Sequence, residues 1–170
     1  MSPSRVASAA RTMAAHGLSV QVPAGWDGSI RRGAGDGSDT PIDDVGPLGT
    51  TNPVLHVASF VLPAVRGDYG GGAVESMRPT DIFVALVEFD PEAGSTALFA
   101  APGLQRPLLP AMFGRGTMHR PLVGASGHQQ FFHTQGRAFG LYVALGAHRL
   151  RSSLVPRVDR VVSTMHIAPA

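Results

Sequence analysis

The sequence predicts an α+β protein: an antiparallel sheet of about five or six strands, packed against a C-terminal amphipathic helix. Three observations favour this class. Several short runs alternate apolar and polar residues, or are apolar throughout, as strands do. Residues 151–165 repeat apolar residues at helical spacing. The 21 glycines and 14 prolines divide 170 residues into short elements, which favours strands over long helices.

The N-terminal region begins with residues 1–15, whose alanine content predicts a frayed helix. Alternation in residues 18–22 then predicts the first strand, and residues 29–32 predict a short return strand. The turn at residues 23–28 contains the only tryptophan, Trp26. We expect its indole to fold over one end of the core, because so large a ring is rarely left in water.

Two apolar runs, residues 54–62 and 82–89, predict strands buried inside a covered sheet. The first follows residues 33–53, a long loop rich in Gly, Asp, Pro and Thr, and a loop of that length is either functional or mobile. Between the two runs, the glycine-rich residues 66–72 predict a flexible connection. Residues 73–77 predict one helical turn.

The region of residues 92–127 contains prolines that forbid long elements, so we expect a loop with a short extended piece near residues 120–123. Residues 129–145 predict a β-hairpin whose second strand alternates and reads as half-buried. In the first strand, Phe131 and Phe132 point to opposite faces. We expect one ring in the core and the other beneath a covering helix, with a dimer or partner surface as the alternative.

The last predicted element is the amphipathic helix of residues 151–165. Ser152 or Ser153 suits its N-cap, and Pro156 is tolerated in its first turn. Such a short helix is stable only when it packs on the sheet. Its apolar face comprises Leu154, Val155, Val158, Val161, Val162 and Met165.

The order of these elements resembles a known fold. Residues 22–26 (VPAGW) end a strand in a Pro-x-Gly-Trp turn, residues 142–145 (YVAL) form a late hairpin strand, and residues 165–167 (MHI) end the helix in a short apolar tail. This order resembles the PsbP-like superfamily, which includes small actinobacterial proteins and lipoproteins. The resemblance spans residues 18–167 and implies a binding or assembly role rather than catalysis. The chain differs from the lipoproteins in lacking a signal sequence and a lipidation cysteine, and no functional residue of the family is matched.

Charge is distributed unevenly along the chain. Residues 1–102 hold six arginines and eleven acidic residues, whereas residues 103–170 hold eight arginines and a single acidic residue, Asp159. The arginine-rich half suits an acidic partner or phosphates, and the alternative is that the halves pack together and offset each other's charge. No basic run is interleaved with aromatic residues, so nucleic-acid binding is not expected. No apolar run or leader predicts a membrane span or export, so we expect a cytoplasmic protein.

The sequence contains no recognisable catalytic, metal-binding or phosphate-binding motif. Cysteine is absent, and His128 and His133 point to opposite faces of one strand, so neither a metal site nor a cofactor is expected. The glycine run at residues 69–73 matches no phosphate-binding motif and reads as a linker rather than an anion site. Ser126 misses the G-x-S-x-G pattern by one residue. Four acids lack the spacing of a calcium loop and read as turn residues: Asp36, Asp39, Asp43 and Asp44.

The sequence therefore predicts one domain, residues 1–170, with a non-catalytic interaction or accessory function. We expect the partner to be another protein, a second copy of the chain included. The alternative is a protein that binds a small ligand or anion in a cleft between the sheet and the glycine-rich loops, and a third reading is an enzyme without a recognisable motif. Four residues form the candidate partner or ligand surface: Trp26, Tyr69, Phe132 and Arg137.

Overall fold

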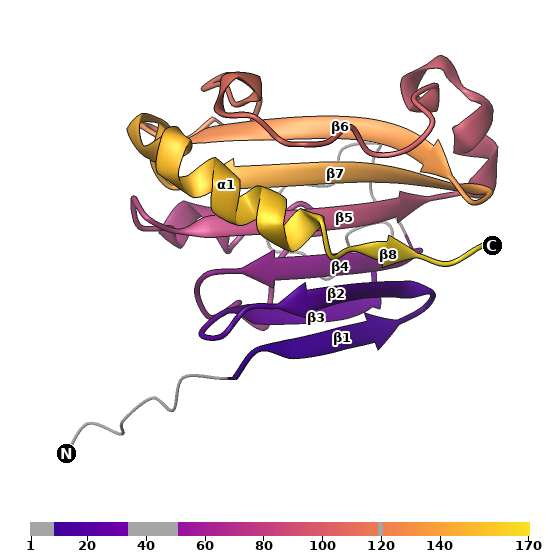
Figure 1. Ribbon diagram of the computed structural model, residues 1–170, viewed down its shortest axis with the longest axis horizontal. Helices are drawn as coiled ribbons and strands as arrows, with labels where there is room; N and C mark the ends of the chain where they lie inside the picture. The colour runs from indigo at the N-terminus through magenta and orange to yellow at the C-terminus, as the bar shows by residue number, and fades with distance from the viewer. Residues whose placement is uncertain (1–8, 34–50, 119–120) are drawn as a thin grey trace.

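A computed structural model of the chain describes residues 9–33, 51–118 and 121–170 (Figure 1). The larger sheet contains β3 (Asp27–Arg32), β4 (Pro53–Ala58), β5 (Ile82–Phe89), β6 (Ser126–Thr134) and β7 (Arg137–Leu145). The smaller sheet contains β1 (Arg11–Ala15), β2 (Leu18–Val22) and β8 (His166–Ile167). Helix α1 spans Arg151–Val162. Single 3-10 turns lie at Val74–Ser76, Pro91–Ser95, Ala97–Phe99, Pro110–Met112 and His148–Leu150.

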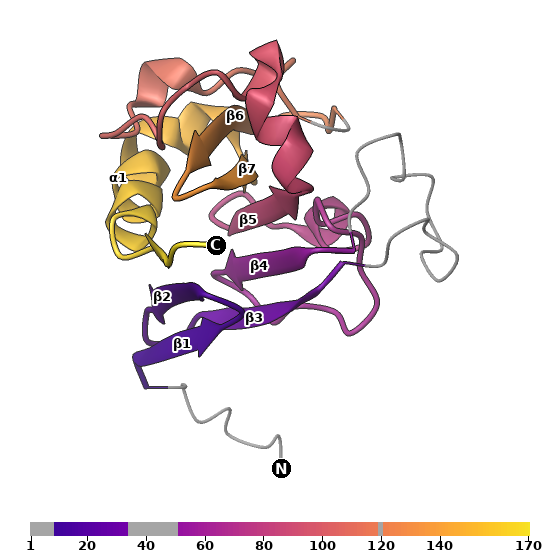
Figure 2. The same cartoon turned by 90° about the vertical axis from the view of Figure 1, so that its right-hand side faces the viewer.

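The predicted α+β class is confirmed. The larger sheet is antiparallel with the strand order β3-β4-β5-β7-β6, and the smaller sheet has the order β1-β2-β8. Figure 2 shows α1 and β2 on one side of the larger sheet and the segment of residues 59–77 on the other. No described helix is long and apolar enough to cross a membrane.

The main core fills the space between the larger sheet and the layer formed by α1 and β2. Val155 and Val158 of α1 are fully buried there, which confirms the predicted apolar face of the helix. A second core covers the opposite face of the sheet, where Phe83 and Tyr142 meet Tyr69 from the preceding loop. The central strands therefore lie between two apolar layers.

Burial on both faces corrects the prediction for the second hairpin strand. β7 is not half-buried, because all nine of its residues are buried. The layer that covers its second face consists of loops. Loops have no hydrophobic periodicity, so this layer could not be predicted from the sequence. The segment of residues 66–72 belongs to that layer: Asp68–Gly71 are buried, so it packs on the sheet instead of forming a flexible connection.

The prediction of a helix at residues 11–15 is wrong, because these residues form β1. His16 and Gly17, with φ of 51° and 74°, make a tight turn that returns the chain antiparallel to β2. Pairing with β2 supplies backbone hydrogen bonds, and these cannot be predicted from the alanine-rich composition of the segment. Residues 1–8 of the predicted helix lie outside the described residues.

The predicted N-caps of α1 are also wrong. Leu150 occupies the N-cap position after the 3-10 turn of residues 148–150, and the Ser153 hydroxyl donates to the Leu150 carbonyl (2.9 Å). The helix ends at Val162, three residues earlier than predicted.

Three further boundaries differ from the prediction. Strand β4 ends at Ala58, not at residue 62, and residues 121–123 form no strand. Of the predicted loop at residues 33–53, Pro53 belongs to β4, while residues 34–50, with their four aspartates, lie outside the described part of the chain. The predicted strand at residues 82–89 is confirmed with the same bounds.

Candidate binding groove

A groove of about 240 Å³ opens where α1 ends above the larger sheet. Its floor consists of Leu86 from β5 and Phe132 from β6, whose exposed fractions are only 1% and 2%. Two walls rise from this floor: one is formed by α1 and β8, the other by the loop around residue 104. The apolar wall residues are Leu104, Val162, Met165 and Ile167, and the polar mouth contains Arg106, Thr134, Gln135, Ser163 and His166.

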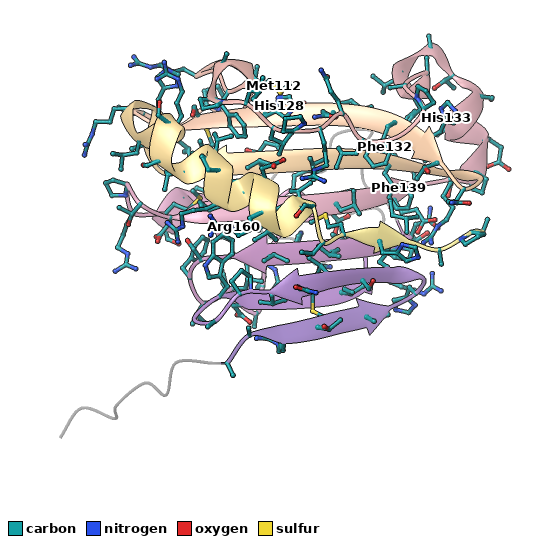
Figure 3. All side chains as sticks on the ribbon, viewed as in Figure 1. Met112, His128, Phe132, His133, Phe139 and Arg160 are labelled. Atoms are coloured by element: carbon teal, nitrogen blue, oxygen red, sulfur yellow. The ribbon has the colours of Figure 1, made fainter. Side chains whose placement is uncertain are left out.

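The groove exists because α1 is shorter than the strands that it crosses. Beyond Val162 the chain leaves the helix and enters β8, so α1 does not extend over the aromatic side chains at this end of the sheet. Phe132 stacks on Phe139 with ring centroids 5.7 Å apart. Figure 3 shows both rings beyond the C-terminal end of α1, above β8. The end of the helix thus sets the position of the hollow.

The loop wall is fixed to the outer edge of β6. The Gln130 side chain accepts a hydrogen bond from the Gln105 N–H (2.9 Å) and donates one to the Gln105 carbonyl (3.2 Å), as a neighbouring strand would. The Gly103 N–H also donates to the His133 carbonyl (2.8 Å). These bonds hold the loop at a defined distance from the helix, so the groove is preformed on this side.

The opposite wall is held by Arg137. Its guanidinium forms an ion pair with Glu88 (2.7 Å) and donates to the backbone carbonyls of His16, Gly17 and Ala168 at 3.0, 3.3 and 3.1 Å. Ala168 directly follows β8, so this one side chain fastens the C-terminal segment to the hairpin turns. Arg137 is therefore a positioning residue for the groove, since its donors are occupied by the chain itself.

The mouth of the groove contains hydrogen-bond donors. Arg106 and His166 line it, and no described Asp or Glu side chain does. Arg106 pairs with Asp159 (3.2 Å), whose other carboxylate oxygen accepts from the Leu108 N–H (2.9 Å). Neither the Nη1 donors of Arg106 nor its planar face are used in those contacts. A polar or anionic group at the mouth can therefore bind Arg106 without displacing Asp159.

The four residues predicted as a partner or ligand surface are all buried, and the structure does not bring them together. Only Phe132 lines the groove. Trp26 lies in the main core beneath the guanidinium of Arg157, 5.5 Å from its ring, as the sequence predicts for the indole. Tyr69 lies in the second core, with its ring centroid 6.2 Å from that of Tyr142. The burial of Trp26 and Tyr69 leaves little area at which a partner could contact these two residues.

Sequence reasoning missed most of the groove. Leu104 and Arg106 lie in the proline-rich region that gave no periodic signal, and Ile167 lies in a tail too short to show a period. The available signal was the Phe131–Phe132 pair. Phe132 enters the main core, whereas Phe131 packs on the other face against Phe89 and Phe99, under the 3-10 turns of residues 91–99. The second ring is therefore covered, but by 3-10 turns and the rings of Phe89 and Phe99 instead of the predicted helix.

The glycine-rich segment of residues 66–72 packs closely on the sheet. Gly70, with φ of 87°, lies so close to the Phe83 ring that an added Cβ would be 2.5 Å from it. The N–H of Gly72 donates to the Glu75 carboxylate (2.7 Å), which occupies a donor that an anion would need. Beside this segment is a smaller hollow of about 210 Å³, lined in part by Met77 and Met118. The groove over Phe132 is the larger of the two.

The histidines of β6 are separated as the sequence predicts. His128 contacts the Met112 carbonyl through Nδ1 (3.2 Å), while His133 contacts the Phe99 carbonyl (2.6 Å) on the other face. Burial lowers the pKa of His128. Ser126 is buried and makes no hydrogen bond to His128, so the two do not form a nucleophile–base pair. Within the described residues, no three His, Asp or Glu side chains gather as metal ligands would.

Comparisons with protein-family models, curated proteins and solved structures give no match. The resemblance to the PsbP-like superfamily therefore stays a prediction.

Proposed function

We propose that the protein is a non-catalytic binding protein whose groove receives an apolar side chain from another protein. The observation that supports this proposal is the hollow over Leu86 and Phe132, where the main core reaches the surface beneath a polar mouth. Protein interfaces commonly concentrate their binding energy in a few anchor side chains that fill such pockets. Both walls are fixed by hydrogen bonds, so an incoming side chain meets a site that needs no rearrangement.

The size of the groove favours a side-chain anchor over the alternative of an enclosed small ligand. Sites that enclose whole small molecules commonly measure roughly 300–1,000 Å³. The groove holds about 240 Å³ and is bordered by exposed residues such as Ser163 and His166. That space suits one large apolar side chain whose backbone stays at the mouth.

Five large apolar residues are exposed at different places along the described chain: Val61, Val65, Leu98, Leu109 and Val123. One of them, Val123, lines the smaller hollow of about 210 Å³. Single exposed apolar residues are normal on soluble proteins and need no partner. The groove is therefore the stronger basis for a binding function.

The test is a selection of peptides from a random library on the immobilised protein, followed by affinity measurements with two variants. Ser163→Trp places an indole at the mouth of the groove. Ser152→Trp places the same residue on the exposed surface of α1, roughly 16 Å away along the helix. We expect selected peptides to share an apolar residue and to bind the native protein and Ser152→Trp equally. Burying one anchor gives about 1.5–3 kcal/mol, so Ser163→Trp should weaken binding at least about tenfold.

Equal binding to all three proteins would contradict the proposal, since the groove would then not be the site. A selection that yields no peptide would also contradict it. If compact aromatic acids then raised the melting temperature of the native protein but not that of Ser163→Trp, the small-ligand alternative would replace the proposal.

A further inference from the structure

The strand β8 turns a backbone edge toward the groove. In the ladder with β2, Leu18 lies opposite Ile167 and Ser19 opposite His166. Just beyond this ladder, the Ala168 N–H donates to the Gly17 carbonyl (2.8 Å). Successive residues of an antiparallel strand direct their N–H and C=O groups alternately toward the partner strand and away from it. Since Ala168 faces β2, the N–H and C=O of Ile167 face away from β2, on the side of the groove that Ile167 lines.

These two groups find no acceptor or donor in the described part of the chain. Their neighbours are already engaged: the Met165 N–H donates to the Val162 carbonyl (3.1 Å), and the Ala170 N–H donates to the Gln135 carbonyl (3.1 Å). The other edge near the groove, that of β6, is covered by the loop that Gln130 holds. The edge of β8 at Ile167 is thus the place where an added strand can pair.

We propose that the segment bound in the groove lies extended beside β8 and exchanges two backbone hydrogen bonds with Ile167. An unpaired strand edge is a template for an incoming strand, and pockets beside it select side chains. In this arrangement one apolar side chain of the segment enters the hollow over Phe132, and a carboxylate reaches Arg106 at the mouth. The Nη1 group of Arg106 supports the acidic group, because the contacts of Arg106 with Asp159 use only Nε and Nη2. This inference rests on the proposed function.

The strand pairing is tested at Ile167 itself, with a peptide taken from the selection as the probe. Ile167→Pro removes the N–H that faces the groove but leaves the bonds between β8 and β2, and the preceding residue His166 is already extended, as proline requires. Ile167→Val retains the N–H and nearly the same side chain. We expect Ile167→Pro to bind the peptide about tenfold more weakly than Ile167→Val does, the factor that one ordinary hydrogen bond supplies.

A second set of measurements uses the native protein and modified peptides. N-methylation of the backbone at the position that pairs with Ile167 should weaken binding about tenfold, while N-methylation at the adjacent position should leave it unchanged. Replacing the acidic residue of the peptide by its amide should weaken binding about threefold to tenfold, and the loss should shrink at high salt.

The outcomes separate this inference from the proposed function. If Ser163→Trp blocks binding but Ile167→Pro and every N-methylated peptide bind like their controls, the groove is the site and the strand pairing is wrong. If Ser163→Trp leaves binding unchanged, the proposed function itself is wrong. Should Ile167→Pro lose its native circular dichroism spectrum, the N-methylated peptides decide alone, and a flat N-methylation profile overturns the pairing.

Discussion

Acidification should destabilise the protein through His56, a fully buried residue of β4. Its Nδ1 accepts a hydrogen bond from Arg66 Nε (2.8 Å), so the proton of the neutral ring lies on Nε2, which donates to the Asp68 carbonyl (2.7 Å). The pKa of His56 is lowered from 6.5 to about 3 in all: burial lowers it most, the hydrogen bond to the Asp68 carbonyl raises it, and the positive charges of Arg66 and Arg31 lower it. Protonation of Nδ1 would also place its N–H against the Nε–H of Arg66. The folded protein therefore requires His56 to be neutral.

The sign of the pH dependence follows from the difference between the pKa of His56 in the folded and in the unfolded chain. The unfolded chain takes up a proton at this histidine below pH 6.5, whereas the folded chain does not do so until about pH 3. The free energy of unfolding is therefore unaffected above pH 6.5 and falls as the pH drops from 6.5 toward 3. Each pH unit corresponds to about 1.4 kcal/mol, so at two units below 6.5 the loss from His56 alone is roughly 3 kcal/mol.

The assay is urea denaturation of the native protein and of His56→Gln at pH 7.5 and pH 4.5. Glutamine does not titrate, and its amide can both donate to the Asp68 carbonyl and accept from Arg66. All other titrating groups are common to the two proteins, so the difference between them isolates His56. We expect the native protein to lose roughly 3 kcal/mol more than His56→Gln over this range.

Equal losses in the two proteins would refute the reasoning, as would a native protein that gains stability on acidification. If His56→Gln does not fold, an NMR titration of the native protein gives the same answer. The imidazole signals of His56 should then stay constant from pH 7.5 to pH 4.5. A midpoint near pH 6 would contradict a buried neutral ring.

Three further substitutions probe the walls and cores by their effect on the free energy of unfolding, measured in urea at pH 7.5. Arg137→Ala should lower the free energy of unfolding by about 3–5 kcal/mol, because it leaves the mostly buried Glu88 without its ion pair. It should also weaken peptide binding, because the C-terminal wall of the groove is released. A loss below about 1 kcal/mol would contradict this role of Arg137. Val158→Ala should cost about 2 kcal/mol through a cavity beneath α1, with unchanged circular dichroism as the sign that only packing is lost. Gly70→Ala should cost at least about 2 kcal/mol, since its Cβ would clash with Phe83 at a positive φ; native stability would show that the loop can move away from the ring.

The sequence alone determined the elements that carry their own pattern. The apolar face of α1 and the strands β2, β4, β5 and β7 were predictable, because periodicity is a local property that a short stretch displays regardless of its neighbours. The placement of Trp26 in the core followed from the cost of exposing an indole. For Phe132, alternation with Phe131 predicted that one ring would enter the core, and the groove is built on that ring.

Only the tertiary structure decided which segments meet. β1 is a strand because β2 returns beside it, and β7 is buried on both faces because aperiodic loops form the second layer. The groove likewise arises where α1 stops short, where Gln130 holds the loop before Leu108, and where Arg137 fastens the chain after β8. Each of these contacts joins residues that are distant in the sequence or hidden in irregular segments. Their energies depend on proximity in space, and no local pattern of residues records that.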